Sequence, residues 1–132
     1  MNNMEDNEVE VANELAPEIL EKIEKKVQEL KSKDAKLRVV YPIVVEGGAY
    51  DDKPLYVGYF RQPSFMAFSK YLTASQSNQA VAMRTLANDC FLDGDKDLIN
   101  DDSLFLFGLM GQLSQIIEMR NGRLINLSKP GK

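Results

Sequence analysis

Apolar positions recur at spacings of three and four residues in the first regular part of the chain. They form one stripe made of Ile19, Leu20, Ile23, Val27 and Leu30. Pro17 suits the first turn of a helix, where its missing amide donor is not needed. We therefore predict a helix from about residue 15 to residue 31. Its other faces alternate Glu and Lys, as a solvated helix surface does.

The period changes to two after residue 36, which predicts a strand. One face of that strand would carry Leu37, Val39, Tyr41, Ile43 and Val45. Pro42 indicates an edge strand, because proline cannot donate a ladder hydrogen bond. Residues 55–60 repeat the strand pattern after the Gly- and Asp-rich turn 47–53, so the two strands should form an antiparallel hairpin. Because a lone hairpin is marginal in water, one face must lie against helices or a partner.

Helical spacing returns after Pro63-Ser64. The proline ends the strand, and the serine can accept a hydrogen bond from the first free amides of a helix. The apolar spacing predicts a second helix that starts at residue 65 and gives way to a polar stretch at 73–78, and a third helix over 81–90. We expect the acidic stretch 93–97 to be a loop before the last helix.

The last helix is predicted from Asp102 to Met119, closed by a left-handed cap at Asn121-Gly122. A turn between strands at this dipeptide is the alternative. The first turns also carry Leu104, Phe105 and Phe107. They give the helix more apolar surface than one core stripe needs. Either the helix is central and surrounded by its own domain, or its apolar face docks another chain.

Together these patterns predict an α+β fold in which an antiparallel β-hairpin packs with a mainly helical body of about four helices. The chain has 132 residues, enough for one domain with its own core. We expect that single domain over 15–127. A flexible acidic arm at 1–14 would precede it, and a C-terminal tail at 128–132 would follow.

Composition narrows the classes of partner. The net charge is −4 and the pI is about 4.9, whereas nucleic-acid binding draws on an excess of Lys and Arg. The single cysteine, Cys90, favours a reducing compartment. The acidic N-terminus does not resemble a secretory leader, and no apolar run is long enough to span a bilayer. We therefore expect a cytosolic protein without a nucleic-acid or membrane partner.

The sequence lacks a residue type on which many catalytic sites depend. It contains no histidine, which excludes the commonest general base, the Ser-His and Cys-His nucleophile pairs and imidazole metal sites. Cys90 lies on an apolar helix stripe and is interpreted as a small buried hydrophobe. We predict that the protein is not an enzyme, with no catalytic residue, no cofactor and no metal ligand.

The nearest approach to a metal site is the alternation of Asp93, Asp95 and Asp97, which matches the first ligands of a calcium loop. The match then fails. Leu98 stands where the loop needs glycine, and Leu104 stands where a bidentate glutamate should close the ligand shell. A solvated loop between helices is therefore preferred to a weak cation site.

Apolar helical surface is the remaining route to function. The predicted partner-binding residues are the stripe Ile19, Ile23, Val27 and Leu30 and the turn Leu104, Phe105 and Phe107. We expect both to be exposed. Serine at Phe105 and Phe107 should then abolish partner binding and leave the domain folded, whereas loss of folding would assign these residues to the core.

Three short strings carry a resemblance to a known family. They are Tyr59-Phe60-Arg61-Gln62-Pro63-Ser64, Ala87-Asn88-Asp89-Cys90 before Asp93-Gly94, and Asn121-Gly122-Arg123-Leu124. With the charged first helix and the aliphatic last helix, the chain from about Leu15 to Leu127 resembles small tail assembly chaperones of tailed bacteriophages and prophages. The resemblance implies a non-enzymatic protein of the host bacterial cytoplasm that binds the tape measure protein during tail assembly.

The rival interpretation is a structural component that stays in the virion, such as a connector, tail or capsid accessory subunit. In that case the hairpin would add strands to a neighbouring subunit. A homo-oligomer is compatible with both interpretations, and the sequence leaves the oligomeric state open.

The calcium alternative can be tested directly. If Asp93, Asp95 and Asp97 bind no calcium, the midpoint of thermal unfolding should be the same in millimolar calcium and in chelator, because only a ligand that binds the folded state stabilises it. A midpoint that rises with calcium concentration would establish the metal site.

Overall fold

The structure is a computed structural model that describes residues 15–117 and 121–128. The elements in chain order are α2 (Pro17–Lys33), β1 (Tyr41–Glu46), β2 (Leu55–Phe60), α3 (Phe65–Ser75), α4 (Gln79–Cys90), β3 (Phe91–Gly94), α5 (Asp97–Asn100), α6 (Asp102–Leu104), the π-helical η1 (Phe105–Leu109) and α7 (Met110–Ile117). The predicted arm at 1–14, the predicted helix end at Met119 and residues 129–132 lie outside the described residues.

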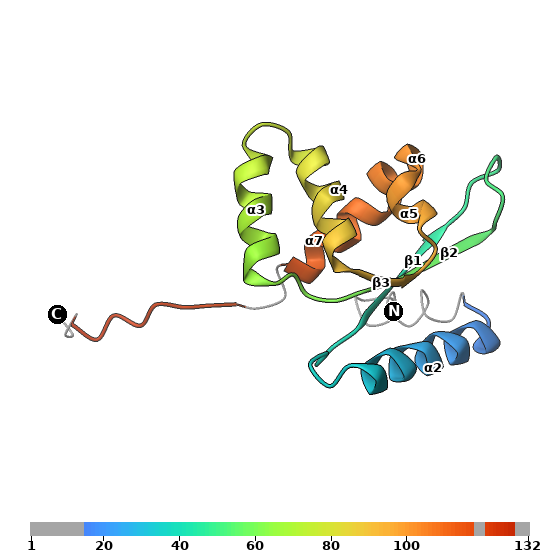
Figure 1. Ribbon diagram of the computed structural model, residues 1–132, viewed down its shortest axis with the longest axis horizontal. Coiled ribbons are helices and arrows are strands. Elements are labelled where there is room, and N and C mark those ends of the chain that lie inside the picture. The colour runs from blue at the N-terminus through green and yellow to red at the C-terminus, as the bar shows by residue number, and fades with distance from the viewer. Residues whose placement is uncertain (1–14, 118–120, 129–132) are drawn as a thin grey trace, which may run out of the picture.

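The elements form three layers around a small antiparallel sheet (Figure 1). The strand order is β1-β2-β3. Helix α2 covers one face of the sheet, and the helices from α3 to α7 lie on the other side. The predicted α+β class, a hairpin packed with a helical body, is confirmed.

The hairpin has the predicted antiparallel pairing, with Tyr41 opposite Phe60 and Glu46 opposite Leu55. Strand β1 is an edge strand, as Pro42 indicated. It begins at residue 41, four residues later than the alternation suggested. Each face of the hairpin is covered by a different layer. Ile43 and Tyr56 contribute to the core under the helical body, whereas Tyr59 faces α2.

The third strand was not predicted. The acidic stretch was expected to be a loop, but its first residues belong to β3, which pairs antiparallel with β2. Gly94 makes this pairing possible. Its φ is 113°, and a Cβ there would lie 2.4 Å from the carbonyl oxygen of Val57. Only glycine fits that backbone conformation and that close approach.

The main core lies between the sheet and the helical body. Its largest fully buried side chains are Phe60, Phe105, Leu86, Leu98, Ile99, Leu109 and Leu113. A smaller core of Ile23, Val40 and Tyr59 lies between α2 and the opposite face of the sheet. Since a side chain on a strand points to one face only, the alternation along β2 supplies both cores.

The last helix is not regular throughout. A π-helical turn, η1, interrupts it between α6 and α7, where one continuous α-helix had been predicted. Phe105 and Leu109 are buried on the core side of this turn, and Phe107 points outward with 86% of its surface exposed. Gly108 lies against strand β1, because a Cβ there would be 2.6 Å from Cγ1 of Val45.

The two glycines of this helix should respond in opposite ways to alanine. Gly111→Ala should stabilise the protein by up to about 1 kcal/mol, because nothing lies within 4 Å of the added methyl and alanine is the better helix former. Gly108→Ala should destabilise it by about 1 to 3 kcal/mol, because the stiff Val45 side chain must move. Urea unfolding measures both. Equal effects of the two substitutions would contradict this packing.

Candidate functional site

The predicted stripe on the first helix is covered by the protein's own sheet. Ile23 is buried in the smaller core, and Ile19, Val27 and Leu30 are partly buried against it. The expectation that this stripe is exposed for a partner was therefore wrong. Helical periodicity shows that one face is apolar, but it does not show what covers that face.

The predicted turn on the last helix is divided between core and surface. Leu104 and Phe105 are buried, which corrects the expectation that they are exposed. The guanidinium of Arg84 lies 5.0 Å from the centre of the Phe105 ring and donates a 2.8 Å hydrogen bond to Asp102. This cation–π contact covers the ring from the solvent side. Phe107 alone remains exposed from the predicted set.

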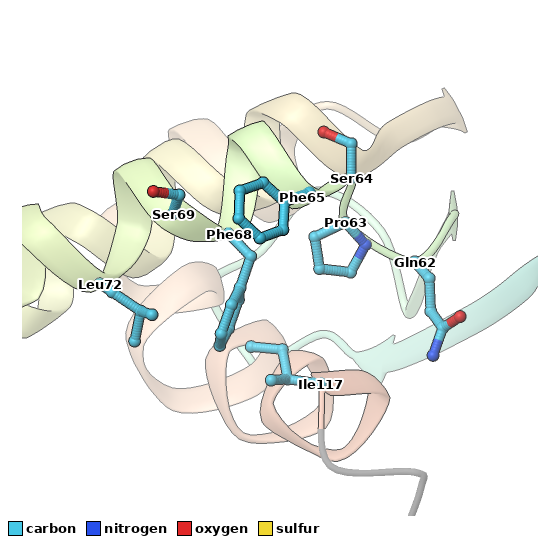
Figure 2. Close-up of a pocket in the computed structure, with 8 residues that line it drawn as sticks. All are labelled: Gln62, Pro63, Ser64, Phe65, Phe68, Ser69, Leu72 and Ile117. Atoms are coloured by element: carbon cyan, nitrogen blue, oxygen red, sulfur yellow. The ribbon is translucent and has the colours of Figure 1, made fainter.

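An apolar groove lies between α3 and the end of α7 (Figure 2). Its volume is about 380 Å³. It is lined by Gln62, Pro63, Ser64, Phe65, Phe68, Ser69, Leu72 and Ile117. Figure 2 shows the ring of Phe68 pointing from α3 toward Ile117 at the end of α7. The polar side chains of the lining are Gln62 and Ser64, on either side of Pro63, and Ser69 of α3.

Local sequence explains one wall of the groove. Ser64 caps α3 by accepting a 3.1 Å hydrogen bond from the amide of Ala67. That cap fixes where the helix begins, so Phe65, Phe68 and Leu72 follow at positions i, i+3 and i+7 on one face. Because no residue of α3 is fully buried, this apolar face is left partly open to solvent.

The groove residues were not singled out from the sequence. Phe65, Phe68 and Leu72 had been assigned to an ordinary amphipathic helix, whose apolar face is usually core. One signal was present: Met66 adds an apolar residue off that face. Phe65 is in fact 85% exposed and Met66 is also exposed. Helix α3 therefore carries more apolar surface than the domain buries.

The alternating aspartates do not converge on one point. Asp93 forms a 2.7 Å ion pair with Lys26 of α2. Asp95 pairs with Lys53 and accepts a 2.9 Å hydrogen bond from the amide of Val57. Over residues 15–117 and 121–128, no group of three or more His, Cys, Asp or Glu side chains could hold a metal ion. Asp93 thus links β3 to α2, and Asp95 links the end of β3 to β2.

Cys90 is a core residue, as the sequence indicated. It lies at the end of α4 and is buried. Burial raises the pKa of its thiol to about 11. A thiol with so high a pKa is almost wholly protonated near neutral pH, and the protonated form is a weak nucleophile.

The role of Asp95 gives a prediction for pH dependence. Burial raises the pKa of this carboxyl, but the Lys53 ammonium and the Val57 amide outweigh burial and hold it below its ordinary value. A lowered pKa in the folded state adds stability above the unfolded-state pKa of about 3.9, and that stability is lost as the pH falls through the folded-state pKa.

Asp95→Asn should therefore lower the free energy of unfolding by about 1 to 3 kcal/mol at neutral pH. The difference from the unsubstituted protein should shrink as the pH falls below the unfolded-state pKa, and it should approach zero once the pH is below the lowered folded-state pKa of Asp95. Urea unfolding at several pH values measures the difference. Asp52→Asn, in the exposed turn between β1 and β2, is the matched control. A difference that stays constant with pH would exclude the ion pair as its source.

Comparison with known proteins establishes a fold likeness and no family. No protein-family model matches the chain, and no curated protein matches it. It is similar to the structure of the uncharacterised protein rbstp2171 from Bacillus stearothermophilus, with 22% identity and a TM-score of 0.53. The match covers 75% of this chain and 98% of that one. No helix in the described residues is long and apolar enough to cross a membrane. At this identity the likeness concerns the fold alone.

Proposed function

We propose that this protein is a non-enzymatic assembly chaperone of a tailed bacteriophage or prophage, and that it holds an apolar helical segment of the tape measure protein in the host cytoplasm. The observation that carries the proposal is the open apolar groove between α3 and α7. The resemblance of the chain to tail assembly chaperones supplies the identity of the partner.

The shape of the groove suits an amphipathic helix. Helix α3 and the residues just before it form most of the lining, and α7 adds Ile117. Phe65, Phe68 and Leu72 present three apolar contacts along α3. A partner helix would place side chains at i, i+3 or i+4, and i+7 into such a groove. Gln62, Ser64 and Ser69 supply polar atoms at its edge, where the exposed face of the partner helix meets water.

The expected strength of binding suits a chaperone that must release its partner. Burying one Leu or Phe side chain contributes about 1.5 to 3 kcal/mol, so three anchors contribute several kcal/mol. Association itself costs at least about 4 kcal/mol in lost freedom of motion. The small surplus predicts weak, reversible binding. The net charge of −4 helps to keep a protein with an apolar surface soluble.

Removing apolar side chains from the groove should weaken partner binding. The double variant Phe65→Ser with Leu72→Ser should bind a tape measure helix at least tenfold more weakly, because two anchors lose their contacts. Isothermal titration calorimetry with peptides from a phage tape measure protein measures the affinity. Both side chains are at least half exposed, so circular dichroism should show an unchanged fold.

Phe107→Ser and Tyr50→Ser are matched controls, because each removes an equally exposed aromatic ring outside the groove. If the control Phe107→Ser abolishes binding and the groove variant does not, the site lies on η1 instead.

Mass spectrometry of purified particles separates the chaperone from a virion component. The chaperone should be absent or present in traces, and a stoichiometric amount would contradict the proposal.

A further inference from the structure

Beyond the last described helix lies a short apolar segment that none of the described residues buries. Residues 121–128 form neither helix nor strand and run away from the helical body (Figure 1). Leu124, Ile125 and Leu127 are 94%, 65% and 88% exposed. Among residues 124–127 there is no charged side chain. Three large aliphatic side chains so close together form an apolar patch that favours contact with a complementary surface.

The groove is such a surface, and it lies next to the origin of the segment. Ile117, the last described residue of α7, lines the groove, and the apolar residues begin at position 124. Their lengths also agree. From Phe65 to Leu72, seven residues of helix rise about 10 Å, and three steps of extended chain from Leu124 to Leu127 also span about 10 Å. Both surfaces are uncharged, so neither repels the other.

We infer that the groove between α3 and α7 receives the segment Leu124–Leu127 of a second copy of this chain. Figure 1 shows residues 121–128 leading away from α3 and α7, so the segment reaches another molecule without a reversal of direction. In a pair related by a two-fold axis each copy gives a segment and receives one. One symmetric arrangement therefore covers both segments and both grooves, as isologous interfaces do.

This arrangement deepens the proposed function, because it names what covers the groove before a partner arrives. The displacement of the segment by a tape measure helix rests on the proposed function, but the dimer itself does not. When a second copy covers the groove, neither the groove nor the segment Leu124–Leu127 is exposed to unrelated proteins. The partner then competes with the second copy for the same side chains.

Sedimentation equilibrium over a range of concentrations tests the dimer. The unsubstituted chain should show a monomer–dimer equilibrium. The segment variant, Leu124→Ser with Leu127→Ser, should raise the dimer dissociation constant at least tenfold. The groove variant, Phe65→Ser with Leu72→Ser, should do the same. Tyr50→Ser, which removes a fully exposed ring in the β1–β2 turn, should leave the dissociation constant unchanged.

Mixing the two variants supplies the decisive measurement. The segment variant keeps an intact groove, and the groove variant keeps an intact segment. The mixture should therefore form a heterodimer through one contact, although each variant alone is mainly monomeric. A general loss of structure could not give this complementation. An unsubstituted chain that stays monomeric at every concentration, or a dimer that the segment variant leaves intact, would overturn the inference. So would a monomer in which the segment is protected inside its own groove.

The same variants separate this inference from the proposed function. The segment variant should bind a tape measure helix at least as tightly as the unsubstituted chain, because its groove is free. The groove variant should lose both the dimer and the partner. If no dimer forms and the groove variant still loses the partner, only the inference fails. If the dimer forms and no tape measure helix binds, only the proposed function fails.

Discussion

The structure depends on strand β2, which is central in the sheet and is packed from both sides. Tyr56 and Phe60 face the helical body, and Tyr59 faces α2. Phe60 is fully buried and its ring meets Phe91 of β3 edge-on, with the ring centres 5.6 Å apart. Edge-to-face contact is a favoured geometry for aromatic pairs. The six residues of β2 thus connect the hairpin, the third strand and both helical layers.

Elements specified by local signals were predictable from the sequence. Strand alternation and the Gly- and Asp-rich turn gave the hairpin, and Pro63-Ser64 gave the start of α3. Strand β3 was missed because it is four residues long and follows α4 without a turn residue. The strand is held by β2, which is distant in the sequence: Asp95, just after β3, accepts a hydrogen bond from the amide of Val57 in β2. The π-helical turn likewise has no local signal, since it accompanies the packing of η1 against β1.

The candidate site was harder to predict than the fold for a related reason. Apolar periodicity identifies a face that avoids water, but the covering surface is a property of the whole fold. The stripe on α2 looks as suitable for a partner as the face of α3, yet the sheet covers the first and leaves the second partly open. The groove also needs Ile117, which lies 45 residues beyond Leu72 in the chain. No local pattern brings these two residues together.

The attachment of α2 has a consequence of its own. This helix is held by the small cluster of Ile23, Val40 and Tyr59 and by the ion pair between Lys26 and Asp93. Ile23 is the one buried residue of α2, whereas α4 has five, so releasing α2 should cost less free energy than releasing α4. Such an opening would strip one entire face of the sheet, where Val40 and Tyr59 are now shielded. The sheet therefore has a second apolar face, which is shielded from water only while α2 stays in place.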